Sequence, residues 1–413
     1  MLYIYRFLIN ITYIISPIII VFRLFKKKEH PERFKEKLCY FSKFKNKGRL
    51  IWFHGASVGE IQSIIPLIEK FEKKRDVKNI LITSNTLSSS KIIEKFKFKK
   101  VIHQFFPIDT NFNSKKFLNY WKPSVVFFID SEIWPNMIIN LYKKNIPIIL
   151  LNGRITKKTF RRWKNLPKFS NFLFSKINLC FASSNISKNY LKKLGVKNIK
   201  LVGNLKFSQS ENEKIKKFNN LEKFISSKII WCASSTHYTE EKLCGIVHKK
   251  LKEKYKNLLT IIIPRHIERT ELIGEELIKL DLNIHRHNSK EKIHENTDIY
   301  IVNSYGQTKS IYNICKHVFL GGSLINHGGQ NPLEATRYGC NIIHGPSVEN
   351  FNEIFQFLKK RKISYKIDTK FKMIKILNKM FMRKKNFNTA EKKLRTIGQK
   401  ILNNTYNNIK IFI

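Results

Sequence analysis

Short apolar runs recur along the first half of the chain, and most are separated by stretches long enough for a helix. Such runs are typical of buried strands in a parallel sheet whose two faces are covered by helices. The first run, 49–54, is followed by 61–74, where apolar residues repeat at helical spacing and predict a helix. The other strands predicted in this half are 79–83, 124–129, 146–151 and 179–182.

The same alternation restarts after 208–217, a charged stretch that is prone to turns. The strands predicted beyond it are 229–233, 258–263, 299–302, 317–320 and 341–343. The pattern therefore predicts two consecutive α/β domains. Because ligands of such sheets bind beyond the carboxyl ends of the strands, the residues that follow each run are the candidates for chemistry.

One segment near the N-terminus differs from the rest, because 7–22 carries no charge and is mostly apolar. It is shorter than the ~20 residues that cross a bilayer, but apolar neighbours extend it on both sides. A membrane span and a half-buried anchor both fit, and a buried helix of the first domain is the alternative. Lys26, Lys27 and Lys28 follow the segment, which argues against a cleaved signal peptide and predicts that the remainder stays cytoplasmic.

The length of 413 residues fits two domains, and a hydrophobic content of 42% is enough for two cores. The 78 Lys and Arg against 30 Asp and Glu give a formal net charge of +48, which favours polyanionic partners such as nucleic acid, anionic lipid or phosphorylated substrates. A biased genome composition is an alternative source of this charge. The six cysteines lack the spacing of a zinc site, so we predict reduced thiols and no structural metal.

The first predicted strand leads into the loop His54-Gly-Ala-Ser-Val-Gly-Glu60. Its glycines, Gly55 and Gly59, permit unusual backbone conformations and close approach of a ligand. Glu60 is placed either to act as a base beside an acceptor hydroxyl or only to interact favourably with the helix dipole. The loop lacks the motifs that bind nucleoside triphosphates or dinucleotides.

Two more acids, Asp130 and Glu132, follow the strand predicted third along the chain. We expect them at the same sheet edge as Glu60, unless they only cap the next helix. Cations follow two further strand-like runs, at Arg154 and Lys206. Acids and cations together at one edge predict a site for an anionic substrate.

In the second half, 234–237 and the two acids that follow predict a capped helix start whose amides suit a phosphate, with capping alone as the alternative. Arg265 directly follows a predicted strand and is placed to bind a phosphate or a base edge, unless it is a plain surface arginine. The segment 328–334, Gly-Gly-Gln-Asn-Pro-Leu-Glu, is a glycine turn that opens a helix. Its asparagine and acid suit a nucleotide sugar.

Taken in order, these motifs resemble those of one family, the 3-deoxy-manno-octulosonic acid (Kdo) transferases of lipid A assembly. The resemblance extends over about 1–345 and includes the N-terminal anchor. The motifs that carry it are 54–60, 130–136, 152–154, 203–207, 233–237, 264–266, 321–324 and 331–334.

The resemblance implies a GT-B fold, in which two Rossmann-like α/β domains face each other across a cleft. It implies a membrane anchor helix at 1–28, an acceptor-binding domain at 29–208 and a CMP-Kdo-binding domain at 209–413, whose last helices return to the first domain. Members of this family invert the anomeric centre and use no metal ion, and we expect no cofactor.

The resemblance also implies roles for individual residues. Glu60 matches the base that deprotonates the acceptor hydroxyl, and Asp130 and Lys206 match positions that stabilise the transition state. The implied CMP contacts are Pro264, Arg265, Tyr305, Gly306, Gln307, Asn331, Pro332, Leu333 and Glu334.

The chain departs from the family pattern at three of its positions. Asp130 stands where the family usually has glutamate, so Glu132 nearby is a candidate to share its role. Gln307 stands in place of an acid, and Gln330 in place of a histidine. Both changes touch the implied nucleotide contacts.

The partners implied are CMP-Kdo, the lipid A precursor lipid IVA, and anionic lipid of the bacterial inner membrane, at whose cytoplasmic face the anchor would hold the enzyme. One alternative is a GT-B enzyme that uses another nucleotide sugar, because a fold alone does not fix function. Another is a membrane-tethered basic nucleic-acid-binding protein. The chain has no recognisable nucleic-acid-reading motif, so we expect no specific nucleic acid.

Overall fold

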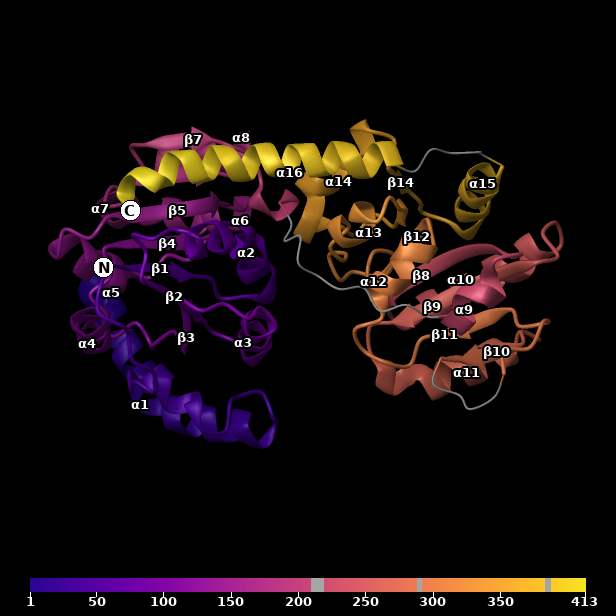
Figure 1. The fold of residues 1–413 in the computed structure, drawn as a ribbon, viewed down its shortest axis with the longest axis horizontal. Helices are drawn as coiled ribbons and strands as arrows, with labels where there is room; N and C mark the ends of the chain where they lie inside the picture. The colour runs from indigo at the N-terminus through magenta and orange to yellow at the C-terminus, as the bar shows by residue number, and fades with distance from the viewer. Residues whose placement is uncertain (209–218, 288–291, 383–387) are drawn as a thin grey trace. The chain divides into compact units, whose positions relative to one another are not determined.

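The computed structural model describes residues 1–208, 219–287, 292–382 and 388–413. The chain forms two compact units, Met1–Glu211 with Thr396–Ile413, and Asn212–Arg395 (Figure 1). Each unit is built around a seven-stranded parallel sheet, so the predicted pair of α/β domains is confirmed. The domain boundary placed at 208/209 borders 209–218, which lies outside the described residues.

The sheet of the first unit has the order β3-β2-β1-β4-β5-β6-β7. Its strands are β1 (Leu50–His54), β2 (Asn79–Ser84), β3 (Val101–Phe105), β4 (Val125–Ile129), β5 (Ile148–Gly153), β6 (Leu179–Ala182) and β7 (Ile199–Leu201). The helices and 3₁₀ turns of this unit are α1 (Leu2–Phe25), η1 (Arg33–Leu38), α2 (Val58–Glu72), α3 (Leu87–Glu94), α4 (Asn111–Trp121), α5 (Pro135–Lys143), α6 (Lys157–Lys164), α7 (Pro167–Phe174), α8 (Asn185–Leu194), η2 (Leu205–Phe207) and η5 (Lys410–Phe412).

Both faces of this sheet are buried, which explains why its strands read as continuous apolar runs. In β1, Trp52 lies in the core on one face, whereas Ile51 and Phe53 lie in the core on the other. The second of these cores also contains Ile401 and Ile409 from α16 (Asn388–Ile409). The end of the chain is therefore part of the first unit.

The N-terminal apolar segment forms α1, which is long and apolar enough to cross a membrane, and most of it is exposed. Pro17 lies inside this helix and has no N–H to donate to the Tyr13 carbonyl. The Ser16 hydroxyl donates to that carbonyl instead, at 2.7 Å. The helix therefore continues past the proline as far as Phe25.

The sheet of the second unit has the order β10-β11-β9-β8-β12-β13-β14. Its strands are β8 (Ile229–Thr236), β9 (Leu258–Pro264), β10 (Ile284–Arg286), β11 (Ile299–Ile301), β12 (His317–Leu320), β13 (Asn341–His344) and β14 (Ser364–Lys366). The helices and 3₁₀ turns are α9 (Asn219–Ile225), α10 (Glu240–Lys252), η3 (Ile267–Arg269), α11 (Thr270–Ile278), α12 (Thr308–Ile314), α13 (Leu333–Arg337), η4 (Glu349–Phe351), α14 (Asn352–Lys360) and α15 (Lys370–Phe381).

Candidate active site

Each sheet has a point where the strand order reverses, between β1 and β4 in the first unit and between β8 and β12 in the second. The loops that leave two such neighbouring strands turn to opposite faces of the sheet, which opens a crevice at their carboxyl ends. Glu60 and Asp130 follow β1 and β4, and 321–324 follows β12. The candidate residues of both units thus lie where α/β sheets bind ligands.

Glu60 lies in the first turn of α2. Ser57 is the N-cap: its hydroxyl accepts from the Glu60 amide at 3.4 Å and donates to Glu60 Oε1 at 2.7 Å. The Ala56 amide donates to Glu60 Oε2 at 2.7 Å. This arrangement resembles a capping box, except that the carboxylate accepts from the amide of Ala56, the residue before the N-cap, so Glu60 does contribute to the helix start. The same hydrogen bonds hold both carboxylate oxygens in one orientation at the sheet edge.

The surroundings of Glu60 change its acidity. Burial raises the pKa of Glu60 to about 7, assisted by the negative charges of Glu132 and Asp130, while the hydrogen bonds from Ser57 and Ala56 act in the opposite direction. Glu132 and Asp130 thus both lie close enough to Glu60 for their charges to act on it. A carboxylate whose pKa is near neutrality is suited to accept a proton from a hydroxyl.

The two glycines of the loop have different surroundings. A Cβ added at Gly55 would lie 3.1 Å from Glu60 Cβ, whereas one added at Gly59 would meet nothing within 4 Å. Neither glycine has a left-handed backbone, so the conformational freedom that glycine permits is not used at these two positions. Gly55 instead leaves room for the Glu60 side chain, and there is open space at the Cβ position of Gly59.

Asp130 is buried directly after β4 and makes an ion pair with Lys206, whose Nζ lies 2.7 Å from Asp130 Oδ2. The Asn152 amide side chain donates to the other oxygen of Asp130, and its own oxygen accepts from the Leu205 amide at 2.9 Å. Asp130 and Asn152 both have a left-handed backbone, with φ of 56° and 54°. Asp and Asn tolerate this conformation better than other side chains, which suits the aspartate at this position. Lys206 is thereby fixed at the edge of the sheet.

Glu132 is held by His54 and Trp134, and these contacts were not predicted from the sequence. Glu132 Oε2 lies 3.2 Å from His54 Nε2 and accepts from Trp134 Nε1 at 2.9 Å. His54 is buried, and its other ring nitrogen lies 2.9 Å from Thr83 Oγ1. The carboxylate of Glu132 is therefore a fixed negative charge near Glu60.

The alternative in which Asp130 and Glu132 cap the next helix is wrong. The capping acid of α5 is Asp109, whose carboxylate accepts from the Asn136 amide at 2.9 Å and the Met137 amide at 2.8 Å. Because Asp109 occupies the helix start, the carboxylates of Asp130 and Glu132 make their contacts with side chains at the sheet edge.

In the second unit, the expectation for 234–237 was wrong. Residues up to Thr236 belong to β8, and α10 begins later, at Glu240. The buried carboxylate of Glu240 accepts four backbone N–H groups at 2.7 to 3.2 Å, which belong to His237, Gly322, Ser323 and Leu324. The His237 amide proposed for a phosphate is thus used by a side chain of the protein itself. Glu240 joins the loops that follow β8 and β12.

The residues expected to contact CMP lie in three loops beyond the carboxyl edge of the second sheet. Pro264 ends β9, and the amide of Arg265 donates to the Thr236 carbonyl at 2.9 Å. The residues 305–307 lie between β11 and α12, and the Tyr305 hydroxyl donates to Glu268 Oε1 at 3.1 Å. The third group lies at the start of α13 and comprises Asn331, Pro332, Leu333 and Glu334.

The side chain of His237 lies between two of these loops. The sequence had suggested a role only for its backbone amide. Its ring lies 4.4 Å from that of His327 and 5.9 Å from that of His266. Gln330 Nε2 lies 3.5 Å from His237 Nε2. Burial lowers the pKa of His237 to about 4, and the neighbouring histidines and Arg265 add to this effect. His237 thus lies between the Arg265 loop and the segment that opens α13.

The loop before α12 has room and hydrogen-bonding capacity for a ligand. No donor in the described part of the chain reaches the buried Oε1 of Gln307. An unmet buried acceptor is unfavourable, and a ligand hydroxyl or amino group would satisfy it. At Gly306, where φ is +84°, an added Cβ would meet nothing within 4 Å.

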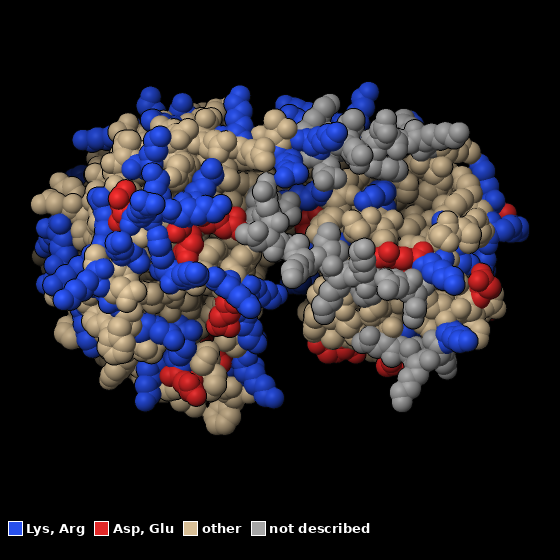
Figure 2. All heavy atoms as spheres, in the orientation of Figure 1, with Lys and Arg blue, Asp and Glu red and all other residues tan. Residues whose placement is uncertain are grey.

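The surface of the first unit carries much of the positive charge. On the face shown in Figure 2, Lys and Arg side chains are spread over this unit, with few Asp and Glu between them. The six cysteines are free and buried. Among the described residues, no group of three or more His, Cys, Asp and Glu side chains is arranged to hold a metal ion.

The fold has counterparts among solved structures. A UDP-GlcNAc 2-epimerase from Neisseria meningitidis, solved with bound UDP-GlcNAc, has a TM-score of 0.59 and 14% identity, covering 88% of this chain and 99% of that chain. The glycotransferase of kitacinnamycin has a TM-score of 0.54 and 10% identity, covering 89% of this chain and 100% of that chain. At such low identity the likeness shows the fold alone, which is the predicted GT-B fold.

Comparisons of the amino-acid sequence identify a family, which the comparisons of the fold do not. The family model described as 3-deoxy-D-manno-octulosonic-acid transferase (kdotransferase) matches residues 32–209. A 3-deoxy-D-manno-octulosonic acid transferase from Rickettsia bellii is 31% identical over 381 residues, 91% of this chain and 90% of the relative. One from Haemophilus influenzae is 32% identical over 312 residues, 75% of this chain and 73% of the relative. The chain therefore belongs to the 3-deoxy-D-manno-octulosonic acid transferase family of glycosyltransferases.

Proposed function

We propose that this protein transfers Kdo from CMP-Kdo to the lipid A precursor lipid IVA, with inversion at the anomeric carbon and without a metal ion. The observation that carries the proposal is Glu60, a carboxylate oriented by two hydrogen bonds, with a pKa of about 7, beside the Lys206–Asp130 ion pair. The membership of the chain in the Kdo transferase family supports the choice of sugar.

In the proposed reaction, the Glu60 carboxylate takes the proton of the acceptor hydroxyl. The hydroxyl oxygen then forms a bond to the anomeric carbon, and the bond from that carbon to the CMP phosphate oxygen breaks. The bonding electrons leave with CMP, so negative charge grows on its phosphate. Lys206 offsets this charge, and Asp130 both orients Lys206 and offsets positive charge that develops on the sugar.

We propose that the second unit binds the donor through Pro264, Arg265, Tyr305, Gly306, Gln307, Asn331, Pro332, Leu333 and Glu334. The unmet Oε1 of Gln307 and the open backbone at Gly306 support a nucleotide contact there. In this proposal Gln307 accepts from a donor on the nucleotide, as the usual acid would, but without a negative charge. Arg265 provides a cation for the phosphate.

We further propose that the first unit binds the acceptor and that α1 holds the protein at the cytoplasmic face of a bacterial inner membrane. A lipid acceptor lies in that membrane, and the exposed apolar surface of α1 supports the attachment. The lysine-rich surface of the unit suits anionic phospholipid and the phosphates of a lipid A precursor.

The test is to incubate the purified full chain with lipid IVA and either CMP-Kdo or UDP-GlcNAc, and to measure the mass of the lipid and the release of nucleotide. We expect CMP release with CMP-Kdo only, together with an increase in lipid mass that corresponds to Kdo. Transfer from UDP-GlcNAc, or no transfer from CMP-Kdo with tight binding of duplex DNA, would contradict the proposal.

A further inference from the structure

The helix α1 is held to the first unit at both of its ends. Within α1, the residues that are not exposed recur every three or four positions, with Arg6 directly after Tyr5 and Leu24 directly after Arg23, which is the pattern of a single helix face. They are Leu2, Tyr5, Arg6, Ile9, Tyr13, Ser16, Ile20, Arg23 and Leu24. This face is a continuous stripe from the first turn of the helix to the last.

The start of α1 is joined to the unit by polar contacts. The Tyr5 hydroxyl donates to Asp109 Oδ2 at 2.8 Å, and Arg6 Nε donates to Asn136 Oδ1 at 2.9 Å. Arg6 also donates to Asn111 Oδ1 at 3.3 Å. These partners lie at the starts of α4 and α5, and Figure 1 shows the beginning of α1 beside these two helices.

The other end of α1 is joined to the same unit through η1. Arg23 pairs with the buried Glu29 at 2.5 Å, and Lys37 of η1 pairs with Glu29 at 2.7 Å. Within η1, Arg33 makes an ion pair with Glu36 at 2.9 Å.

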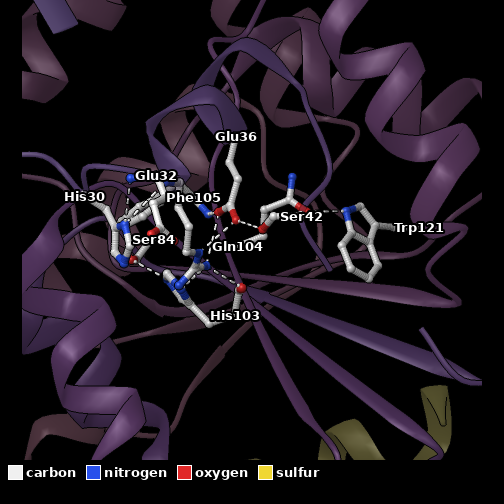
Figure 3. Close-up of polar contacts among 10 residues, drawn as sticks. His30, Glu32, Glu36, Ser42, Ser84, His103, Gln104, Phe105 and Trp121 are labelled. Carbon is white, nitrogen blue, oxygen red and sulfur yellow. Dashed lines mark hydrogen bonds and ion pairs between the residues drawn. The ribbon is translucent and has the colours of Figure 1, made fainter. Parts of the chain in front are cut away.

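The turn η1 is in turn attached to the edge strand β3. Arg33 donates to the His103 carbonyl at 2.7 Å, and Glu36 accepts from the Phe105 amide at 2.7 Å. Figure 3 shows Glu36 and His103 within this polar network. Both ends of α1 are therefore fixed to one compact unit.

A spanning helix cannot keep these contacts. With 24 residues, α1 is about 36 Å long, and a bilayer core is about 30 Å thick. If α1 crossed the bilayer, one of its ends would leave the unit, and either the Tyr5 and Arg6 contacts or the Arg23 contact would be lost. The polar groups of the stripe would then face lipid, which is unfavourable.

The remaining faces of α1 are exposed and mostly apolar, although Asn10 and Thr12 also lie there. They include Ile14 and Ile18, which are 74% and 73% exposed, and Phe25, which is 83% exposed. Exposed lysines follow directly at 26–28. A helix with an apolar face and adjacent cations matches the boundary between the headgroups and acyl chains of an anionic leaflet.

We propose that α1 lies in the plane of one leaflet that contains anionic lipid, docked along the first unit, and does not cross the bilayer. This inference does not depend on the transferase activity. In this arrangement the first unit has a fixed orientation on the membrane, because one face of α1 contacts the unit and the other faces of the same helix contact lipid.

The topology is tested with the full chain in spheroplast inner membranes. Because the native cysteines are buried, Tyr3→Cys and Lys27→Cys each introduce one exposed thiol at opposite ends of α1. We expect that a membrane-impermeant maleimide labels neither variant in intact spheroplasts and labels both after detergent opens the membrane. Labelling of either variant from outside would show that α1 spans and would overturn the proposal.

The lipid contact is tested with vesicles of phosphatidylcholine, with and without phosphatidylglycerol. We expect the double variant Ile14→Ser/Ile18→Ser to bind anionic vesicles more weakly than the native chain by about tenfold or more, since each substitution removes an exposed apolar side chain that the proposal buries in lipid. The matched control, Leu272→Ser/Phe371→Ser, removes exposed apolar residues of the second unit and should bind like the native chain.

Two outcomes would contradict this lipid contact. One is vesicle binding by the double variant that equals the native value. The other is that the native chain is a dimer in lipid-free buffer and does not bind vesicles, whereas the double variant is a monomer. The exposed faces of α1 would then contact a second copy of the chain instead of lipid.

Discussion

At the scale of residues, three carboxylates at one sheet edge are held by different partners. Glu60 is held by the loop at its own helix start, Asp130 by Lys206, and Glu132 by His54 and Trp134. These partners keep negative charges beside one another, and that proximity contributes to the pKa of about 7 for Glu60. Glu132 therefore influences the acidity of Glu60 through its charge.

This arrangement predicts the pH dependence of the reaction. A base works only when deprotonated, so kcat/KM of the native chain should rise with pH and level off above about 7. The variant Glu132→Gln removes a negative charge that raises the pKa of Glu60. Its acid limb should therefore move to lower pH, as measured by CMP release in buffers of constant ionic strength. A limb at the native position, or one moved upward, would contradict the coupling.

At the scale of elements, the loops after β8 and β12 depend on one side chain. The Glu240 carboxylate accepts four backbone N–H groups, including those of Gly322 and Ser323, and it is buried. Buried amides that lose their acceptor are costly. Glu240 is thus expected to hold the glycine-rich segment in place for the donor loops.

The variant Glu240→Ala should accordingly lower the free energy of unfolding by about 3 kcal/mol or more and weaken CMP-Kdo binding. The matched control is Glu253→Ala, also in the second unit, which removes a surface ion pair with Lys250 and should change stability by about 0.5 kcal/mol or less. Urea unfolding and donor titration measure the two effects. Equal stabilities of the two variants would refute the structural role of Glu240.

The sequence predicted the buried strands well, because each lies between two helical layers and is apolar on both faces. It missed the edge strands of both sheets, β3, β7, β10 and β14. In β3, His103 and Gln104 interrupt the apolar pattern. Their polar groups are met by distant residues: Ser84 lies 2.9 Å from His103 Nε2, and Trp121 donates to Gln104 Oε1 at 3.0 Å. The spacing of apolar residues within one segment carries no information about hydrogen-bond partners from distant segments.

The same reasoning explains what was missed in the site. The strand ends located Glu60 and Asp130 correctly at one edge, because parallel strands end together. The contact of His54 with Glu132 joins residues 78 positions apart, and no local pattern predicts it. Likewise, the sequence suggests that the amides after β8 are free to bind a phosphate, whereas in the fold the His237 amide donates to the Glu240 carboxylate.

At the scale of the whole molecule, the proposed chemistry is divided between the two units. The base and the Lys206–Asp130 pair belong to the first unit, and the proposed CMP contacts belong to the second. A change at Glu60 should therefore affect turnover without removing the donor site. Binding of the donor and transfer of the sugar can therefore be measured separately in a variant of Glu60.

The role of Glu60 as the base is tested most directly by comparing Glu60→Gln with Glu69→Gln, a matched change farther along α2. The measurements are the dissociation constant of CMP-Kdo and the turnover with lipid IVA. We expect Glu60→Gln to keep near-native donor binding and to lose turnover by a factor on the order of a hundred or more, since it lacks the base. Glu69→Gln should retain both. Near-native turnover of Glu60→Gln would show that Glu60 is not the base.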